Sequence, residues 1–225
     1  LLSYKFNWSS SQDLIRQTDA NFLGLIDITN TKRDFIELIL NEFEVFGEGD
    51  FALGINKEKE DIDYSSYGTI YEKTINMKSI FSSSNFKFQR NSLFASIRSS
   101  EHDLYNNNIS WNIEGLRVLN SSWKMGFSRG SSFRSPVSSE LYGFGGNLFL
   151  KPEINKSSEL NIKRIKENSK LNISIFRGDI TNLIDFDYQD YVLKNITQSS
   201  NEGVEVKYKL IGNNWDLSFI LRAQN

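Results

Sequence analysis

The feature that most constrains this chain is an alternation of apolar and polar side chains with a period of two, repeated along most of its length. The clearest example lies near the end of the chain, where one set of alternate residues is apolar and the other charged: Val204, Val206, Tyr208 and Leu210 against Glu205, Lys207 and Lys209. Successive side chains of a strand point to opposite faces of a sheet. The pattern therefore predicts β-strands that each have one apolar and one polar face.

The same alternation, together with turn-forming residues between the segments, predicts eleven strands. They are expected near residues 1–8, 33–45, 51–58, 70–81, 86–98, 108–116, 121–130, 156–166, 170–185, 192–210 and 215–225. In the fifth of them the alternation changes phase between Arg90 and Leu93, which predicts a β-bulge there. Helical spacing fits only short pieces, such as the ambiguous segment from Phe35 to Phe43.

The expected connections between these strands alternate in length. The longer ones fall at residues 9–32, 59–69, 99–107 and 130–155, and the shorter ones at residues 46–50, 82–85, 117–120, 167–169 and 211–214. Long loops on one side and short turns on the other are typical of outer-membrane β-barrels. A soluble β-sandwich has no reason to keep this alternation, because its crossover connections scatter the long links.

Strand length supports a membrane protein. Several expected strands exceed ten residues, and a tilted transmembrane strand needs about 9–11. No apolar run reaches the roughly 18–20 residues that a spanning helix requires. Because an open sheet edge in lipid would leave backbone groups without hydrogen bonds, such a sheet must close. We therefore predict an all-β fold, an antiparallel transmembrane β-barrel segment with about 11 strands of a larger barrel of about 22.

Composition argues against several other functions. The formal net charge of −2 gives no basic excess for nucleic acid. The chain has no Cys and one His, His102, so a thiolate site or a Ser–His pair has little to draw on, and we expect no enzyme and a structural role for His102. An outer-membrane enzyme, an adhesin and a soluble carbohydrate-binding β protein remain as alternatives from other classes.

A motif-rich segment runs from Gly126 to Glu159 and holds both prolines of the chain. Its notable positions are Phe133, Arg134, Ser135, Pro136, Leu141, Tyr142, Gly143, Gly146, Asn147, Leu150, Lys151, Pro152, Glu153 and Glu159. This segment resembles the signature loop of TonB-dependent outer-membrane receptors. Further matches follow at residues 176–185 and 201–205, and the Leu-Tyr-Gly-Phe and Leu-Ile-Asp-Phe-Asp runs resemble the cobalamin-receptor branch. We expect an ordered loop at the extracellular mouth.

The resemblance implies a receptor in the outer membrane, surrounded by its lipid, that imports cobalamin or a similarly bulky nutrient with energy from TonB. A siderophore or other metal-chelate receptor of the same family is the alternative. The chain starts at Leu1 without a Met or signal sequence and stops at Asn225 inside an expected strand. Residues 1–225 are therefore expected to form part of one barrel domain, without the plug domain that contacts TonB and without the C-terminal strands.

Two sets of residues are candidates for binding. Tyr142 and Phe144, on the signature loop, are expected to stack on a ligand at the mouth. Asp13, Asp19 and Asp27 share the longest early connection, and the resemblance suggests a calcium site there, since carboxylate oxygens are what calcium requires. No other cofactor is expected. The acidic residues Asp185, Asp187 and Asp190 are expected to form a solvated hairpin tip.

Overall fold

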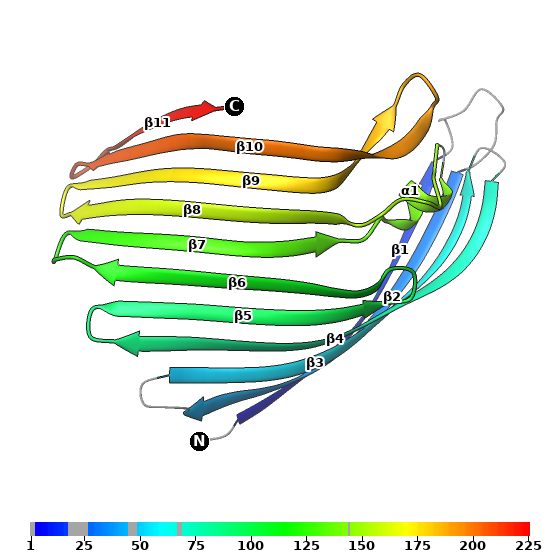
Figure 1. Ribbon diagram of the computed structural model, residues 1–225, viewed down its shortest axis with the longest axis horizontal. Helices are drawn as coiled ribbons and strands as arrows, with labels where there is room; N and C mark the ends of the chain where they lie inside the picture. The colour runs from blue at the N-terminus through cyan, green and yellow to red at the C-terminus, as the bar shows by residue number, and fades with distance from the viewer. Residues whose placement is uncertain (1–2, 18–26, 45–48, 67–68, 144) are drawn as a thin grey trace.

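The computed structural model describes residues 3–17, 27–44, 49–66, 69–143 and 145–225. They form eleven strands and one short helix, and among them no helix is long and apolar enough to cross a membrane. The elements are β1 (Ser3–Gln17), β2 (Asp27–Glu44), β3 (Gly49–Ser66), β4 (Thr69–Phe88), β5 (Asn91–His102), β6 (Asn106–Val118), β7 (Trp123–Arg134), α1 (Ser138–Tyr142), β8 (Glu153–Lys166), β9 (Ser169–Asp187), β10 (Val192–Ile211) and β11 (Asp216–Gln224) (Figure 1).

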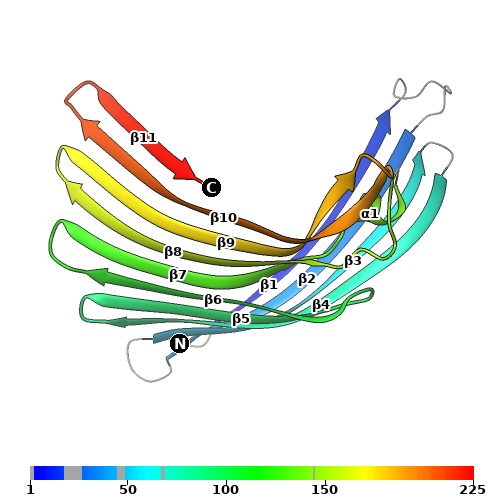
Figure 2. The same ribbon diagram turned by 45° about the horizontal axis from the view of Figure 1, so that its top comes forward.

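All eleven strands belong to one sheet, in which each strand pairs antiparallel with its neighbours in sequence, from β1 at one edge to β11 at the other. The sheet is strongly curved and open, like a trough, with the two edge strands on opposite sides of the opening (Figure 2). This confirms the predicted all-β, antiparallel, sequentially paired sheet and its number of strands. The curvature follows from the tilt and stagger that strands of a barrel adopt.

One predicted connection was wrong. Residues 82–85 are not a turn, because β4 continues through them and pairs with β3 and β5 on both sides. The chain reverses instead after Phe88, where Gln89 adopts a positive φ of 51°. The phase change that predicted a bulge near Arg90 is this hairpin turn, and a register shift lies elsewhere, between Asn41 and Phe43 of β2. A Ser-rich run resembles a turn in sequence, but small polar side chains also suit a strand that lines a polar interior.

The expected long loops were also partly wrong. β3 and β4 pair as far as Ser66 and Thr69, and β5 and β6 as far as His102 and Asn106. The extra residues lengthen the strands, so that β2, β3, β4, β9 and β10 have 18 to 20 residues each. A bilayer needs only about 9–11. The end of the sheet at which β3 joins β4 and β5 joins β6 is called the loop end. The opposite end, with its short connections, is called the turn end.

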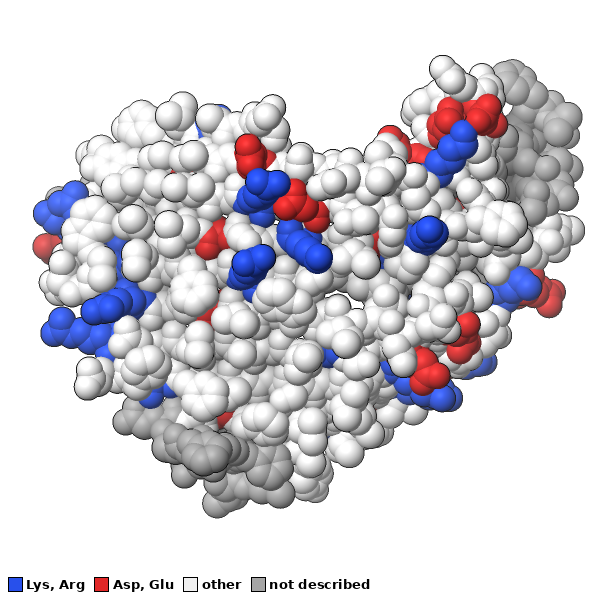
Figure 3. Space-filling model, viewed as in Figure 1, with Lys and Arg blue, Asp and Glu red and all other residues white. Residues whose placement is uncertain are grey.

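The two faces of the sheet differ as predicted. Val204, Val206 and Leu210 share a face with Ile175 and Leu221, and Glu205 and Lys207 point to the other. Following the cross-strand pairs around the sheet places the apolar set on the convex face. The buried side chains within the strands all lie on the concave face: Asn56, Ile62, Ile75, Ser79, Ser100, His102 and Ser174. Figure 3 shows a largely uncharged outer surface with a few charged groups.

Candidate functional site

The connection between β7 and β8 is ordered and is held at its base by Arg134, the last residue of β7. The Arg134 guanidinium donates to both carboxylate oxygens of Glu153, at 2.7 Å each, and to both of Glu140, at 3.0 and 3.2 Å. Glu140 also accepts from the Val137 N–H at 2.8 Å, and Glu153 from the Ile184 N–H at 2.9 Å. Bidentate charge-assisted bonds of this kind fix both distance and orientation. Arg134 therefore joins helix α1 to the first residue of β8.

This network shifts the pKa values of Glu153 and Arg134. The pKa of Glu153 lies below its ordinary value of 4.5, first because its carboxylate accepts hydrogen bonds from Arg134 and also because the Ile184 N–H donates to it, against the effect of burial. The same bonds raise the pKa of Arg134. Both residues stand at the loop end, Arg134 as the last residue of β7 and Glu153 as the first residue of β8. Because these shifts favour the charged forms, Glu153 and Arg134 are ionised at neutral pH.

The middle of the same connection is attached to β10. The Asn147 side chain donates to the Leu193 carbonyl at 2.9 Å, and the Asn195 side chain exchanges two hydrogen bonds with the Lys151 backbone, at 2.7 and 2.9 Å. The Leu193 N–H donates to the carbonyl of Gly145, which has a φ of +67°. That conformation suits glycine. The connection is thus attached to the sheet at three places, which agrees with the prediction of an ordered loop.

Helix α1 carries Tyr142 to the loop end of strands far from it in sequence. The Tyr142 ring lies 4.6 Å from the ring of Tyr71 on β4, and Tyr71 stacks at 4.8 Å on Tyr64 of β3. Tyr64 and Tyr71 are a cross-strand pair on the concave face. Lys73 lies 5.6 Å from the centre of the Tyr142 ring, a cation–π distance. Figures 1 and 2 both show α1 beside the loop ends of β1–β4. We call Tyr64, Tyr71, Tyr142 and Lys73 the mouth cluster.

The mouth cluster contains a polar group without a protein partner. The Tyr71 hydroxyl is buried and has no hydrogen-bond partner among the described residues. Nearby, Tyr105 lies in the turn between β5 and β6, where burial raises its pKa to about 12, with smaller contributions from Tyr142 and Glu140. The Tyr105 hydroxyl is therefore a neutral donor at neutral pH. A buried donor without a partner is uncommon in native structures, and it suits a site that a ligand completes.

Of the two residues predicted to stack on a ligand, the structure describes one. Tyr142 lies in the mouth cluster, and Phe144 lies outside the described residues. Leu141 and Leu150 are buried at 3% exposure, so they hold the connection in place. The sequence reasoning missed the other members of the mouth cluster. The alternation of β3 and β4 could have placed their tyrosines on the polar face, but nothing in the sequence brings them to Tyr142.

The predicted calcium residues are not assembled by the part of the chain described. Asp13 is in β1 opposite Thr31, so it is not in a loop, and the Asp27 backbone is opposite Gln17, four residues further along β1. Asp19 lies outside the described residues. No group of three or more Asp, Glu, His or Cys side chains within the described ranges is placed to hold a metal ion. The calcium site remains a prediction.

His102 and the acidic tip have local structural partners. His102 is 6% exposed, accepts a hydrogen bond from the Leu104 N–H at Nδ1 (3.1 Å) and packs on Tyr105. Burial lowers the pKa of His102, so its ring is neutral at neutral pH. At the tip between β9 and β10, Lys194 forms ion pairs with Asp187, at 2.8 Å, and with Asp190. These contacts explain the buried histidine and the acidic tip as local structural features.

The concave wall below the mouth cluster is lined by small polar side chains. A groove of about 500 Å³ crosses β4 to β8 and is bordered by Ser83, Ser96, Ser110, Asn112 and Arg98, among others. Arg98 contacts the Ser79 hydroxyl at 3.1 Å and lies 5.3 Å from the centre of the Phe81 ring. Such a wall is suited to a hydrated interior.

Comparison with known proteins gives a consistent result. The chain is 28% identical over 176 residues to the vitamin B12 transporter BtuB of Vibrio vulnificus, an alignment covering 75% of this chain and 28% of that protein. It is 24% identical over 156 residues to BtuB of Photobacterium profundum, covering 63% of this chain and 25% of that protein. The chain thus spans about a quarter of the length of these curated relatives.

Solved structures show the same fold. The ferric enterobactin receptor PfeA (Q482A mutant) of Pseudomonas aeruginosa matches all of this chain and 41% of its own, with a TM-score of 0.80 and 17% identity. The siderophore receptor PirA of Pseudomonas aeruginosa matches 99% of this chain and 51% of its own, with a TM-score of 0.75 and 14% identity. The family model described as TonB dependent receptor-like, beta-barrel, matches residues 2–224, and the chain accordingly belongs to the TonB-dependent receptors of the outer membrane, as part of their β-barrel.

Proposed function

We propose that this chain forms part of the wall and the outer mouth of a receptor that imports cobalamin across the outer membrane with energy from TonB. The observation that carries the ligand site is the mouth cluster, where Tyr142 of the signature loop meets Tyr71 at the loop end of the concave face. The similarity to two vitamin B12 transporters favours cobalamin as the ligand. This chain supplies part of the barrel wall and its loops, and in this proposal the plug domain makes the contact with TonB.

The chemistry of the mouth cluster suits a large, partly apolar ligand with polar groups at its rim. Tyrosine rings supply broad contact area, and their hydroxyls supply donors. The Tyr71 hydroxyl, which has no partner within the described part of the chain, is available for an amide or carbonyl oxygen. Anchoring by Arg134 holds Tyr142 in place before the ligand arrives, which lowers the entropic cost of binding.

A metal-chelate ligand is the second candidate, and Lys73 favours it. Its ammonium lies beside the Tyr142 ring, and a cation among aromatic rings would stabilise an anionic ferric chelate. Cobalamin, by contrast, needs no such charge. The two candidates therefore differ in how much they depend on Lys73.

Competition binding to the complete receptor separates these candidates. Membranes that contain the receptor are incubated with labelled cyanocobalamin and then with either unlabelled cyanocobalamin or a ferric catecholate siderophore. We expect only unlabelled cyanocobalamin to displace the label. Tyr142→Ala should weaken binding of cyanocobalamin about threefold to tenfold. Lys73→Gln should change it little, as should the control Tyr188→Ala, whose side chain is exposed at the β9–β10 tip. Saturable binding of the siderophore that depends on Lys73 would replace cobalamin by the chelate.

A further inference from the structure

A second cluster of polar groups lies on the convex face, opposite to the mouth cluster. Cross-strand pairing aligns Arg129 of β7, Ser158 of β8 and Arg177 of β9 in one rung. Lys156 stands one rung nearer the loop end, on the same strand and face as Ser158. Three cations and a hydroxyl therefore surround one point of the outer surface. We call Arg129, Lys156, Ser158 and Arg177 the convex cluster.

The charges of the convex cluster are unequally balanced. Arg177 forms ion pairs with Asp179 of its own strand, at 3.1 Å, and with Glu202 of β10, at 3.7 Å. The carboxylates of this patch therefore pair with Arg177, and among the described residues Arg129 and Lys156 have no ion-pair partner. All three cationic residues are exposed. Although Asp179 is the cross-strand neighbour of Lys156, the three cations outnumber the two carboxylates. Arg129 and Lys156 are therefore the groups with which an added anion could pair.

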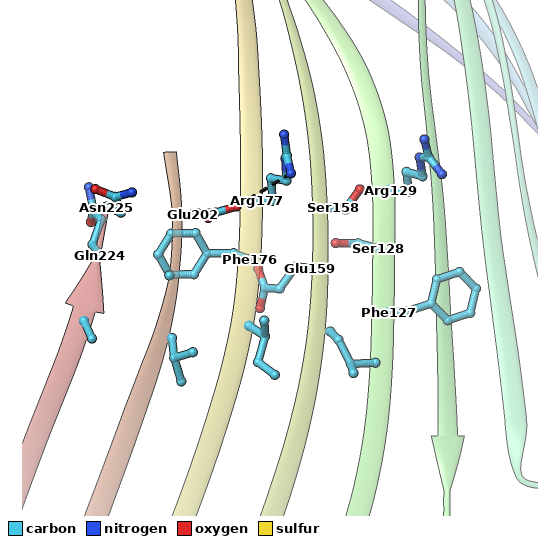
Figure 4. A pocket seen from close by; sticks show the side chains of 15 residues that line it. Phe127, Ser128, Arg129, Ser158, Glu159, Phe176, Arg177, Glu202, Gln224 and Asn225 are labelled. Atoms are coloured by element: carbon cyan, nitrogen blue, oxygen red, sulfur yellow. Dashed lines mark ion pairs between the residues drawn. The ribbon is translucent and has the colours of Figure 1, made fainter. Parts of the chain in front are cut away.

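An apolar groove begins directly below the convex cluster. The next rung toward the turn end consists of Phe127, Leu160, Ile175, Val204 and Ala223. The small Ala223 side chain stands beside larger neighbours, and the groove along this rung has a volume of about 870 Å³. Figure 4 shows the guanidinium groups of Arg129 and Arg177 turned away from the apolar side chains, toward the loop end. Basic side chains at a membrane surface commonly lay the aliphatic part of the side chain along apolar surface and place the charged group in the polar layer.

This arrangement of charge above hydrocarbon matches one kind of molecule. In an outer-membrane barrel the convex face meets lipid, and the loop end meets the outer leaflet. The convex cluster lies where the apolar part of the convex face ends toward the loop end, and Arg and Lys clusters at such a border lie at the height of lipid headgroups. We propose that the convex cluster binds the phosphate of an acylated, phosphorylated lipid of the outer leaflet, with an acyl chain in the groove lined by Leu160, Ile175 and Val204. The site is independent of the transported ligand, because it lies on the opposite face of the wall.

The chemistry within the proposed site is specific. Guanidinium and ammonium groups form charge-assisted hydrogen bonds with phosphate oxygens, and the Ser158 hydroxyl, between two arginines, can donate a further one. A free phosphate ion would use the same donors but would gain nothing from the apolar groove. The groove therefore distinguishes a lipid from a soluble anion.

The test uses the complete receptor, purified in a neutral detergent, and labelled lipid A as the probe. We expect saturable binding, weakened about tenfold or more in the double variant Arg129→Gln/Lys156→Gln, because each cation near a membrane surface contributes appreciably to binding an anionic lipid. Lys163→Gln is the matched control, since Lys163 is on the same strand as Lys156 but on the concave face, and it should bind as the wild type does. Dephosphorylated lipid A should bind as weakly as the double variant binds lipid A.

Three results would overturn the proposal. The double variant could bind lipid A as tightly as the wild type, or the control could lose as much affinity as the double variant. Alternatively, inorganic phosphate at millimolar concentration could displace the labelled lipid completely, which would show a site for a free anion. Because every variant is first checked for the shift in gel mobility between heated and unheated barrel, loss of folding is distinguished from loss of binding.

Discussion

The Tyr142 ring lies 4.6 Å from the Tyr71 ring, inclined at 38°, although one residue belongs to the connection after β7 and the other to β4. The contact connects the signature loop to the inner wall across intervening strands. The loop that carries Tyr142 is anchored by Arg134 and is attached to β10 at Gly145. Each of these supports can be removed separately.

Arg134→Gln should free the connection while the barrel stays folded. The substitution removes a charged group that bonds to Glu140 and Glu153. Because the Arg134 side chain is 43% exposed, we expect a loss of only about 1 kcal/mol. Hydrogen exchange at the backbone amides of Leu141 and Asn147 should accelerate about fivefold.

Arg117→Gln is the control for this experiment, since Arg117 is exposed on the convex face at the turn end. It should leave exchange in the connection unchanged. Equal exchange in Arg134→Gln and in the wild type would show that the packing of Leu141 and Leu150, and not the ion pairs, holds the loop.

The anchoring should depend on pH in one direction only. A carboxyl whose pKa is lowered in the folded protein stabilises it above the ordinary pKa and loses that effect as the pH falls through the lowered value. Glu153 is such a group, so the connection should stay ordered from neutral pH to about pH 5 and loosen below the ordinary value of 4.5.

A nitroxide on Leu148→Cys measures this, because Leu148 is 63% exposed and the chain has no native Cys. The label should become mobile only in the acid range. In Glu153→Gln it should be mobile already at neutral pH and show no such transition. A wild-type transition near neutral pH would assign the anchoring to another group.

Gly145→Ala should disturb the attachment to β10. An added Cβ would lie 2.6 Å from the Phe186 ring and 2.9 Å from the Tyr191 carbonyl, at a φ of +67°. We expect a cost of about 1–2 kcal/mol and faster hydrogen exchange of the Leu193 N–H. Gly178→Ala is the control, because there the nearest atom would be 3.8 Å away. Unchanged exchange in Gly145→Ala would mean that the bond to Leu193 does not need this conformation.

The two faces of the wall should differ in reactivity toward a water-soluble maleimide. Lys207 points to the concave face and Val206 to the convex face. In the complete receptor in membranes, Lys207→Cys should therefore react, and Val206→Cys should be protected by lipid. Fast labelling of Val206→Cys with protection of Lys207→Cys would reverse the assignment of faces.

The sequence predicted the strands well because each face of this sheet meets a uniform environment. Alternation at Val204–Leu210 depends only on the side of the wall, and no close-packed core overrides it. Strand ends were less predictable. β3 and β4 continue to Ser66 and Thr69 because backbone pairing persists beyond the bilayer, where polar residues carry no cost that would mark a boundary. Residues 82–85 were predicted as a turn because serine suits both a turn and a strand that lines a polar interior.

The site was predictable only in part. The motif around Tyr142 marked the loop, and its glycines and prolines indicated that it is ordered. The partners of Tyr142 depend on how far the barrel curves and on where the loop attaches to β10, and neither is encoded in the local pattern around Tyr71. The convex cluster was missed for a similar reason: Arg129, Lys156 and Arg177 come together only through the register of three strands.

The most direct test of the central claim is uptake of labelled cyanocobalamin by cells that produce the complete receptor and lack any other cobalamin receptor. We predict uptake that requires both the receptor and TonB, and that falls when Tyr71 and Tyr142 are replaced together by alanine while the amount of receptor in the outer membrane stays constant. Wild-type receptor that takes up no cyanocobalamin, or that takes it up equally well without TonB, would contradict the account.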